Sequence, residues 1–412
     1  MKSEWIERYR EAGRRERRSA DLLVGFNANI DEIHRSEELD LQNVRPQHVE
    51  KVTSLKGLKK EIKYAELEEK SEEVELDFKP DLEPDKKRIG GQAGIISNFL
   101  TSQGKGVIFY TPFLSNELAD EMNEKILYPT IDGDFVLKNV KDASNSDRTK
   151  KNLVFELEGS HRVIFSRKLR GFGPYFRKGV EENLKELENG VDRIIVGGFH
   201  DVTGNMESKL QKASKQLEKL DKTIHLEFVQ RNETDELVVE NIVPEVDSIG
   251  LDEEEMKELG KHLGVEADEG SLGEAFSVAQ ELIFNHNLSR VHIHTLRYHV
   301  TVVEKNYEIS EEKIRDSMLY GELSALLTAG SGEFPHREDY KDFDMDDKHL
   351  HRLDELEHFS DFFEVPDFPE TGIAEIKGLK VIAIPTLIHE DPGHVVGLGD
   401  IISSGSFTGE IT

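Results

Sequence analysis

The second half of the chain alternates short apolar runs with helical patterns, and this alternation limits the possible fold more than any other feature of the sequence. Five apolar runs are predicted to be buried strands, at residues 193–197, 223–228, 248–251, 290–294 and 380–384. Helical patterns lie between them, for example at residues 206–220, 253–263 and 273–285. Strands that alternate with helices are typical of an α/β fold with a doubly wound, mostly parallel sheet.

The first half contains one more unit of this kind and two segments of different character. Residues 22–26 and 105–110 are predicted strands, and a glycine turn followed by a helix lies between them. Two other segments carry alternating apolar and charged residues, which is typical of half-exposed strands. We therefore expect a smaller, discontinuous, β-rich lid domain. The predicted lid comprises residues 36–87 and 131–169, and the large domain comprises residues 1–35, 88–130 and 170–412.

The composition excludes several classes of protein. The 412 residues exceed a usual single core, and the net charge of −30 argues against a nucleic-acid or anionic-membrane partner. Cysteine is absent, which excludes disulfides and thiolate metal sites. No apolar run reaches membrane-spanning length and the start is not signal-like, so we expect a cytoplasmic protein. The acidic surface fits a salt-rich host or an ordinary acidic protein, and a monomer and a dimer both remain open.

A glycine-rich turn near the C-terminus is the strongest candidate for chemistry. Gly397 and Gly399 precede Asp400, and the following residues are predicted to form a helix. The free N–H groups at a helix start bind phosphate well. A carboxylate beside the bound anion can take a proton from an attacking hydroxyl. This order of residues fits phosphoryl transfer, although the same pattern also occurs in plain turns.

Polar residues follow the predicted strand at residues 22–26. Asn27, Asn29 and Asp31 lie where an open α/β sheet places its ligand crevice. Gly91 and Gln92 open the next helix, where glycine allows close approach and the amide offers a donor and an acceptor. These side chains are candidates for binding hydroxyl groups. The alternative is that the asparagines and the aspartate cap the following turn.

Carboxylates at two other strand ends are candidate metal ligands. Glu227 ends one predicted strand, and Asp252 is a predicted helix N-cap with Glu255 in the first turn. Glu227 and Glu255 together suit Mg²⁺, partly through water, because that ion keeps several waters. The alternative for Glu255 is simple compensation of the helix dipole.

Six short motifs, taken in chain order, resemble those of the archaeal ADP-dependent sugar kinases, the glucokinase and phosphofructokinase group of the ribokinase-like fold. The resemblance spans most of the chain. It rests on residues 25–31, 90–94, 225–227, 252–255, 294–299 and 397–400.

The resemblance implies roles for particular residues. It implies that ADP is the phosphoryl donor, that Asp400 is the base, that Gly397 and Gly399 form the anion hole, and that Glu227 and Glu255 are tied to Mg²⁺. Arg162 is similar to the family's arginine near the transferred phosphate. On the sugar side the resemblance implies Asp31, Gly91 and Gln92, and a lid acid that is Glu72 or Glu73. On the nucleotide side it implies Asp252, which replaces the family's asparagine, together with His299, Val300 and His389.

The preferred sugar depends on charges in the lid. Fructose 6-phosphate needs a cationic pocket, for which Lys151, Arg162 and Arg167 are candidates, whereas glucose needs acceptors such as Glu72. Asn152 stands where glucose-specific members tend to carry histidine. We therefore expect an ADP-dependent phosphofructokinase that can also act on glucose. The alternatives are an ADP-dependent glucokinase, a non-catalytic nucleotide- or sugar-binding module, and an ATP-dependent kinase of the wider fold.

Overall fold

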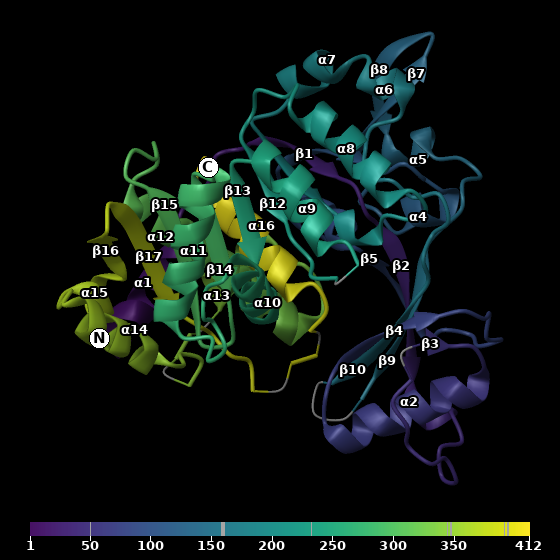
Figure 1. Ribbon diagram of the computed structural model, residues 1–412, viewed down its shortest axis with the longest axis horizontal. Coiled ribbons are helices and arrows are strands. Elements are labelled where there is room, and N and C mark those ends of the chain that lie inside the picture. Colours follow the sequence, from purple (N-terminus) through teal and green to yellow (C-terminus); the bar gives the residue numbers. More distant parts are fainter. Residues whose placement is uncertain are drawn as a thin grey trace.

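The computed structural model describes residues 1–49, 51–157, 161–231, 233–343, 345–346, 348–390, 392–393 and 395–412. Within these ranges the strands form two sheets, one of eleven strands and one of six, which Figure 1 shows as two parts of unequal size. Among the described residues, no helix has the length and apolar character that crossing a bilayer requires.

The large sheet has a parallel centre and antiparallel edges. In spatial order its strands are β16 (Ile373–Ile376), β17 (Leu379–Pro385), β15 (Tyr298–Glu304), β14 (Arg290–His294), β13 (Ser248–Leu251), β12 (Ile224–Glu227), β11 (Arg193–Gly197), β1 (Asp21–Gly25), β6 (Gly106–Tyr110), β7 (Leu127–Asp132) and β8 (Asp134–Asn139). The strands from β14 to β7 pair in parallel, and β15, β16, β17 and β8 pair antiparallel. The five strands predicted in the second half are thus confirmed.

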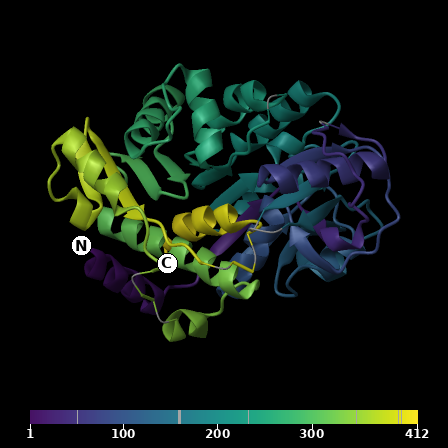
Figure 2. The same cartoon turned by 90° about the horizontal axis from the view of Figure 1, so that it is seen from below.

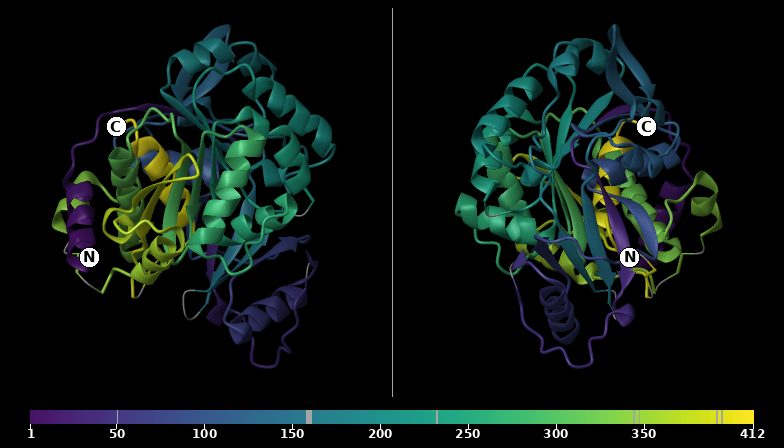
Figure 3. Two further views of the ribbon diagram at one scale, coloured as in Figure 1. Left: turned by 60° about the vertical axis from the view of Figure 1, so that its left-hand side comes forward. Right: turned by 90° about the vertical axis from the view of Figure 1, so that its right-hand side faces the viewer.

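Helices cover both faces of this sheet, as a doubly wound fold requires (Figure 2 and Figure 3). Leu22 and Val24 of β1 share one core with residues of α3 and α16, and Leu23, which points to the other face, shares a second core with residues of α8 to α11. The helices are α1 (Lys2–Arg14), α3 (Gln92–Ser102), α4 (Asn116–Asp120), α5 (Val140–Ala143), α6 (Lys178–Glu181), α7 (Leu184–Asn189), α8 (Met206–Leu217), α9 (Asp235–Asn241), α10 (Glu253–Leu263), α11 (Leu272–His286), α12 (Glu311–Ser331), α13 (Arg337–Asp342), α14 (Leu353–Phe363), α15 (Phe368–Thr371) and α16 (Leu398–Gly409).

The small sheet and one helix form the lid. The spatial order of its strands is β3 (Lys51–Val52), β4 (Glu72–Leu76), β10 (Arg162–Ser166), β9 (Lys151–Glu156), β2 (Asn29–Arg35) and β5 (Lys86–Gly90). Helix α2 (Leu55–Glu68) packs on one face through Leu58, Ile62 and Ala65, and the opposite face looks toward the large domain (Figure 1). An alternating sheet with one covered face is what the sequence predicts for this region.

Two sequence expectations differ from this arrangement. Residues 62–67 belong to the predicted lid segment whose alternating apolar and charged residues indicate half-exposed strands, but they lie in α2. The buried positions 58, 62 and 65 follow helical spacing, and Ser54 caps the helix start by accepting the Gly57 N–H at 3.2 Å. Residues 135–139 were expected in the lid, but β8 pairs with β7 at the edge of the large sheet. Conversely, β2 and β5 belong to the small sheet, although all of β2 and residues 88–90 of β5 are assigned to the large domain by the sequence prediction.

Candidate functional site

Asp400 lies in the first turn of α16, whose N-cap is Gly397. Gly397 has a φ of 75°, and a Cβ there would lie 2.6 Å from Ile95 Cδ1, so the turn requires glycine. At Gly399 a Cβ would lie 2.5 Å from His294 Nε2. Burial, followed by the negative charge of Glu227, raises the pKa of Asp400 well above its usual range. The N-terminus of α16, with its free N–H groups, and the half-buried carboxylate of Asp400 therefore lie side by side.

Three further carboxylates lie in this region, of which Glu227 is buried and Asp252 and Glu255 are half-buried. Glu227 ends β12, and Asp252 caps α10 as the sequence predicts. Asp252 Oδ1 accepts the Glu255 N–H at 2.8 Å, and Glu255 Oε2 accepts the Asp252 N–H at 2.8 Å, which completes a capping box. Burial raises the pKa of Glu255, and the charges of Asp252, Glu227 and Asp400 raise it further. The four acids from three elements thus repel one another electrostatically.

A histidine fixes the orientation of Glu227. His225 Nε2 lies 3.0 Å from Glu227 Oε1 and 3.0 Å from Ser403 Oγ, and its Nδ1 lies 2.8 Å from Ser248 Oγ. Gly250 leaves room for this arrangement, because a Cβ there would lie 2.8 Å from Glu227 Oε2. The strand alternation that places His225 and Glu227 on one face therefore connects β12 to α16, the helix that carries Asp400.

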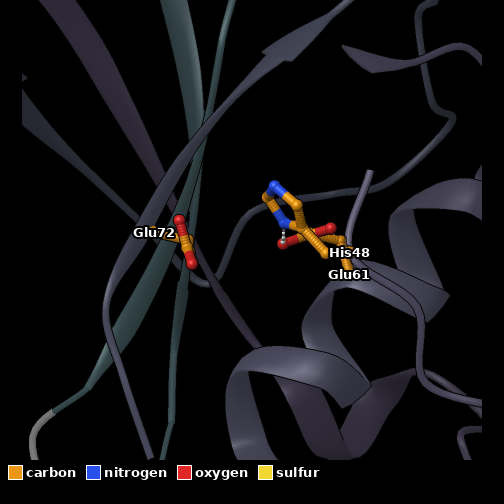
Figure 4. A group of neighbouring side chains, drawn as sticks. All are labelled: His48, Glu61 and Glu72. Atoms are coloured by element: carbon orange, nitrogen blue, oxygen red, sulfur yellow. Dashed lines mark hydrogen bonds and ion pairs between the residues drawn. The ribbon is translucent and has the colours of Figure 1, made fainter. Parts of the chain in front are cut away.

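This acid cluster offers the oxygen donors that a hard divalent cation prefers. The oxygens of Glu227, Glu255 and Asp400 are not, however, grouped as tightly as direct ligands of one ion. Among the described residues, one group of three such side chains has ligand atoms within 4.8 Å of one another, and it comprises His48, Glu61 and Glu72 of the lid (Figure 4). In that group Glu61 already contacts His48 at 3.1 Å, and Glu72 pairs with Lys70 at 2.5 Å.

A cleft of about 760 Å³ extends from the glycine turn at residues 397–399, directly before Asp400, to residues 386–389, which follow β17. We call it the catalytic cleft; its lining includes Asp252, His294, Leu326, His389, Gly397 and Gly399. His299 lines it too, with Nε2 2.8 Å from Glu322 Oε2, and the other oxygen of Glu322 accepts the Leu387 N–H at 2.5 Å. Val300 does not reach this cleft, because it lies inside β15, pairs with Ile293 and Ala383, and is fully buried in the core.

Arg162 brings a positive charge from the lid to the same cleft. The register places it on the face of β10 that points away from α2, since its neighbours Val163 and Phe165 pack in the core against that helix. Burial lowers the pKa of the guanidinium, and the charges of Asp31, Glu73 and Glu156 act in the opposite direction. In this cleft the lid therefore supplies the positively charged guanidinium of Arg162, and the large domain supplies the carboxylates.

Three polar residues that the sequence singled out meet on the cleft-facing side of the lid. Asp31 Oδ1 accepts hydrogen bonds from Asn29 Nδ2 at 2.6 Å and from Asn152 Nδ2 at 3.0 Å. Burial raises the pKa of Asp31 to about 6, although both amides, Lys150 and Arg162 oppose this shift. A buried carboxylate set among amides and nearby cations is suited to accept hydrogen bonds from sugar hydroxyls.

Gly91, Gln92 and Asn27 connect this side to the start of α3. Gly91 is the N-cap, with a φ of 74°, and a Cβ there would lie 2.9 Å from Ala28 Cα. Gln92 Nε2 donates to the Glu227 carbonyl at 3.3 Å, and its Oε1 accepts the Gly198 N–H at 2.9 Å. Asn27 Oδ1 accepts the Ala93 N–H at 3.4 Å. Gln92 and Asn27 thus tie the ends of β1, β11 and β12 together beside the cleft.

Two lid residues proposed for the sugar face the other way. Lys151 pairs with Glu32 at 3.2 Å and with Glu117, on the opposite side of the sheet from Asn152. Glu72 shares the face of Val74 and Leu76, which pack against α2. The strand register explains both cases, because a shift of one residue along a strand reverses the direction of the side chain.

Lys150 and Glu73, which are adjacent in the chain to Lys151 and Glu72, lie instead on the side of the lid sheet that faces away from α2. Lys150 Nζ lies 2.6 Å from Asp201 Oδ2, and Arg231 lies 4.0 Å from Asp201 and 3.7 Å from Glu73. Sequence reasoning missed Lys150, Asp201 and Arg231. Their signal was position alone, since Asp201 follows β11 and Arg231 follows β12, where strand ends collect functional side chains.

Comparisons with known proteins agree with this geometry. The sequence profile described as "ADP-specific Phosphofructokinase/Glucokinase conserved region" matches residues 20–409. An ADP-specific phosphofructokinase of Pyrococcus furiosus is 29% identical over an alignment that covers 82% of this chain and 81% of the relative. An ADP-dependent glucose/glucosamine kinase of the same organism is 25% identical over an alignment that covers 99% of each chain.

A solved structure extends the likeness to three dimensions. It is described as an ADP-dependent kinase complex with fructose-6-phosphate and ADPbetaS, and it superposes with a TM-score of 0.84 at 26% identity. The match covers 100% of this chain and 97% of that one. The ribokinase-like architecture expected from the sequence is thereby confirmed.

Proposed function

Because the chain belongs to the ADP-specific phosphofructokinase/glucokinase family, we propose that it transfers the β-phosphoryl group of ADP to fructose 6-phosphate. The products are fructose 1,6-bisphosphate and AMP, as in a modified glycolysis. The observation that carries the proposal is that Arg162 of the lid and residues 397–399 of the large domain, the turn directly before Asp400, line one cleft. We place the enzyme in the cytoplasm, where its proposed substrates occur.

Asp400 is the proposed general base. Its raised pKa and its position in the first turn of α16 suit it to take the proton of the acceptor hydroxyl as that oxygen attacks the β-phosphorus. The N–H groups that begin α16 stabilise the charge on the transferred group, and the Arg162 guanidinium adds a positive charge from the opposite side. Closure of the lid keeps water from replacing the sugar as acceptor.

The acid cluster is the proposed site for Mg²⁺. Glu227 and Glu255 would hold the ion near the phosphates, in part through water, and the ion would neutralise charge on the phosphoryl group. The donor chemistry fits, because mutual repulsion and burial raise the pKa values of Glu255 and Asp400, and a divalent cation would relieve that repulsion. Asp252 adds a further negative charge beside the nucleotide, and His225 orients Glu227.

The acceptor side favours a sugar phosphate. Lys150, Arg162 and Arg231 gather around Asp31 and Asp201, and a phosphate group would compete with those carboxylates for the cations. Asn29, Asp31 and Asn152 are the proposed partners of sugar hydroxyls. Glu73 is also on this side, at 3.7 Å from Arg231, and it is the feature that favours the second candidate, phosphorylation of glucose.

Steady-state turnover with each pairing of fructose 6-phosphate or glucose with ADP or ATP tests the proposal. We expect the highest kcat/KM for fructose 6-phosphate with ADP, a lower value for glucose with ADP, and little turnover with ATP. Asp400→Asn is the control that separates this site from a contaminating kinase. A preference for ATP would refute the assignment of the donor, and a preference for glucose would reverse the order of the two sugars.

A further inference from the structure

A second cavity, separate from the catalytic cleft, is unusually basic for so acidic a protein. It has a volume of about 470 Å³ and lies between the end of α1, the turn after α3, and helices α12 and α13. Its lining includes Arg15, Arg17, Arg18, Lys105 and Arg337, and it shares no lining residue with the catalytic cleft. In a chain of net charge −30, five basic side chains around one hollow require an explanation.

Neighbouring acids neutralise only part of this charge. Asp316 pairs with Arg15 at 3.2 Å and with Arg17 at 2.9 Å, and Glu16 pairs with Arg337 at 2.6 Å. Among the residues that the structure describes, Lys105 and Arg18 form no ion pair with a carboxylate. The cavity therefore retains positive charge after its internal pairs have formed.

Two of these cations are buried with unused donors. The Arg17 side chain is 7% exposed, and its Nε has no hydrogen-bond partner among the described residues. Lys105 is also 7% exposed, and its Nζ donates to one acceptor in the described structure, the Arg18 carbonyl at 2.5 Å. Burial, with the charge of Arg17, lowers the pKa of Lys105 to about 8. A buried ammonium group without a counter-ion is costly, and an anion would offset that cost.

From this geometry we propose that the cavity binds a compact phosphate-bearing anion. Guanidinium and ammonium groups together are the usual partners of phosphate oxygens, and Arg17, Arg18 and Lys105 supply them from two segments. Base stacking is not favoured there, because the Tyr320 ring is already covered by Arg17 at 4.1 Å and stacked with Tyr340 at 5.2 Å. The ligand is therefore recognised through its phosphate group.

The cavity is one helix away from the catalytic cleft. Tyr320 lines the basic cavity and Glu322, two residues later on α12, lines the catalytic cleft. Between them, a Cβ on Gly321 would lie 2.5 Å from the Ile402 carbonyl oxygen of α16, so the two helix backbones touch. An anion bound in the basic cavity would thus contact α12. This helix packs against α16, which carries Asp400, and it contains Glu322, the partner of His299.

Hydrogen-exchange mass spectrometry in the presence of inorganic phosphate tests the inference, because it reports protection separately for the segments that line the cavity. We expect phosphate, but not sodium chloride at equal ionic strength, to slow exchange in residues 15–19 and 102–106. Arg18 is exposed, and Arg18→Ser is expected to raise the half-saturating phosphate concentration about tenfold or more. Arg14→Ser removes the same charge from exposed Arg14 in the last turn of α1, outside the cavity lining, and is expected to leave this concentration unchanged.

Three outcomes would overturn the inference: no protection of these segments, equal protection by chloride, or the same titration for Arg18→Ser and Arg14→Ser. Lys105→Met provides a second variant, which is expected to abolish the local protection. Repeating the titration with fructose 6-phosphate and with AMP distinguishes the source of the phosphate group. Slower exchange in the same two segments, produced by fructose 6-phosphate or by AMP at a lower concentration than inorganic phosphate requires, supports the inference. The test reads binding, so its failure would leave the proposed kinase reaction untouched.

Discussion

Glu72 and Glu73 are adjacent in the chain but lie on opposite faces of the lid sheet. Glu72 Oε1 is 2.5 Å from Lys70 Nζ on the α2 side, and Glu73 Oε1 is 3.7 Å from Arg231 Nη2 on the side of the large domain. Glu73 is therefore the lid acid in a position to influence the acceptor sugar.

This difference in orientation leads to a paired prediction. Glu73→Gln is expected to lower KM for fructose 6-phosphate several-fold, because Arg231 loses a competing carboxylate, and to weaken any activity on glucose. Glu72→Gln makes the same chemical change one residue away and is expected to leave both KM values unchanged. Kinetics with both sugars check this, and equal effects of the two variants would contradict the assignment.

Asp400→Asn is expected to lower kcat by about 10³-fold, within the range for loss of a general base. The melting temperature should stay the same or rise, because burial and the charge of Glu227 disfavour the ionised carboxylate that the amide replaces. Turnover and thermal unfolding of the same preparation separate these two effects. Full turnover by a folded Asp400→Asn enzyme would rule out its role as base.

Arg162→Lys is expected to lower kcat about 10²-fold while the lid stays folded, since an ammonium group cannot reproduce the fork of a guanidinium. Arg167→Lys is the matched control, because it makes the same change directly after the end of β10. Arg167 donates to the Phe78 carbonyl and is absent from the lining of the catalytic cleft. Single-turnover rates should therefore separate the two variants, and indistinguishable rates would remove Arg162 from the mechanism.

Asp31 predicts a pH dependence of stability. Its pKa in the folded protein is about 6, above the ordinary value of 3.8, so the folded state binds the proton more tightly than the unfolded state. The free energy of unfolding contributed by Asp31 therefore falls as pH rises from about 4 to 6, by roughly 2–3 kcal/mol. Urea unfolding of wild type and Asp31→Asn should diverge over this interval, with the variant gaining relative stability. A constant difference would show that Asp31 titrates normally.

Gly250→Ala is expected to weaken the proposed metal site. The new methyl group would lie 2.6 Å from Ser403 Oγ and 2.8 Å from Glu227 Oε2, so Glu227 must move. We expect the Mg²⁺ concentration for half-maximal activity to rise about tenfold, with partial recovery at high Mg²⁺. Gly273→Ala is the control, because its Cβ would meet only one atom, at 4.0 Å. An unchanged Mg²⁺ requirement in Gly250→Ala would argue against Glu227 as a ligand.

The sequence predicted the central strands and the acid cluster better than the lid. Strands such as Arg193–Gly197 are continuous apolar runs, and Asp252 with Glu255 forms a local capping pattern, so both are readable from neighbouring residues. The faces of Lys151 and Glu72 depend on register with strands far along the chain, which sequence spacing does not give. For residues 62–67 the signal was present, in the cap at Ser54, but the two-residue alternation obscured it.

The chain leaves β1 at Gly25 and enters the small sheet with Asn29 at the start of β2, so Asn29 and Asp31, the proposed partners of the sugar hydroxyls, belong to the lid itself. Asp400 and its glycine turn belong to the other part. Substitutions at the sugar-facing positions of the six-stranded sheet other than Arg162 are therefore expected to change which alcohol is phosphorylated without disturbing how the diphosphate is held. Enzymes that descend from one ancestor with this architecture can therefore differ in acceptor sugar and still use the same phosphoryl donor.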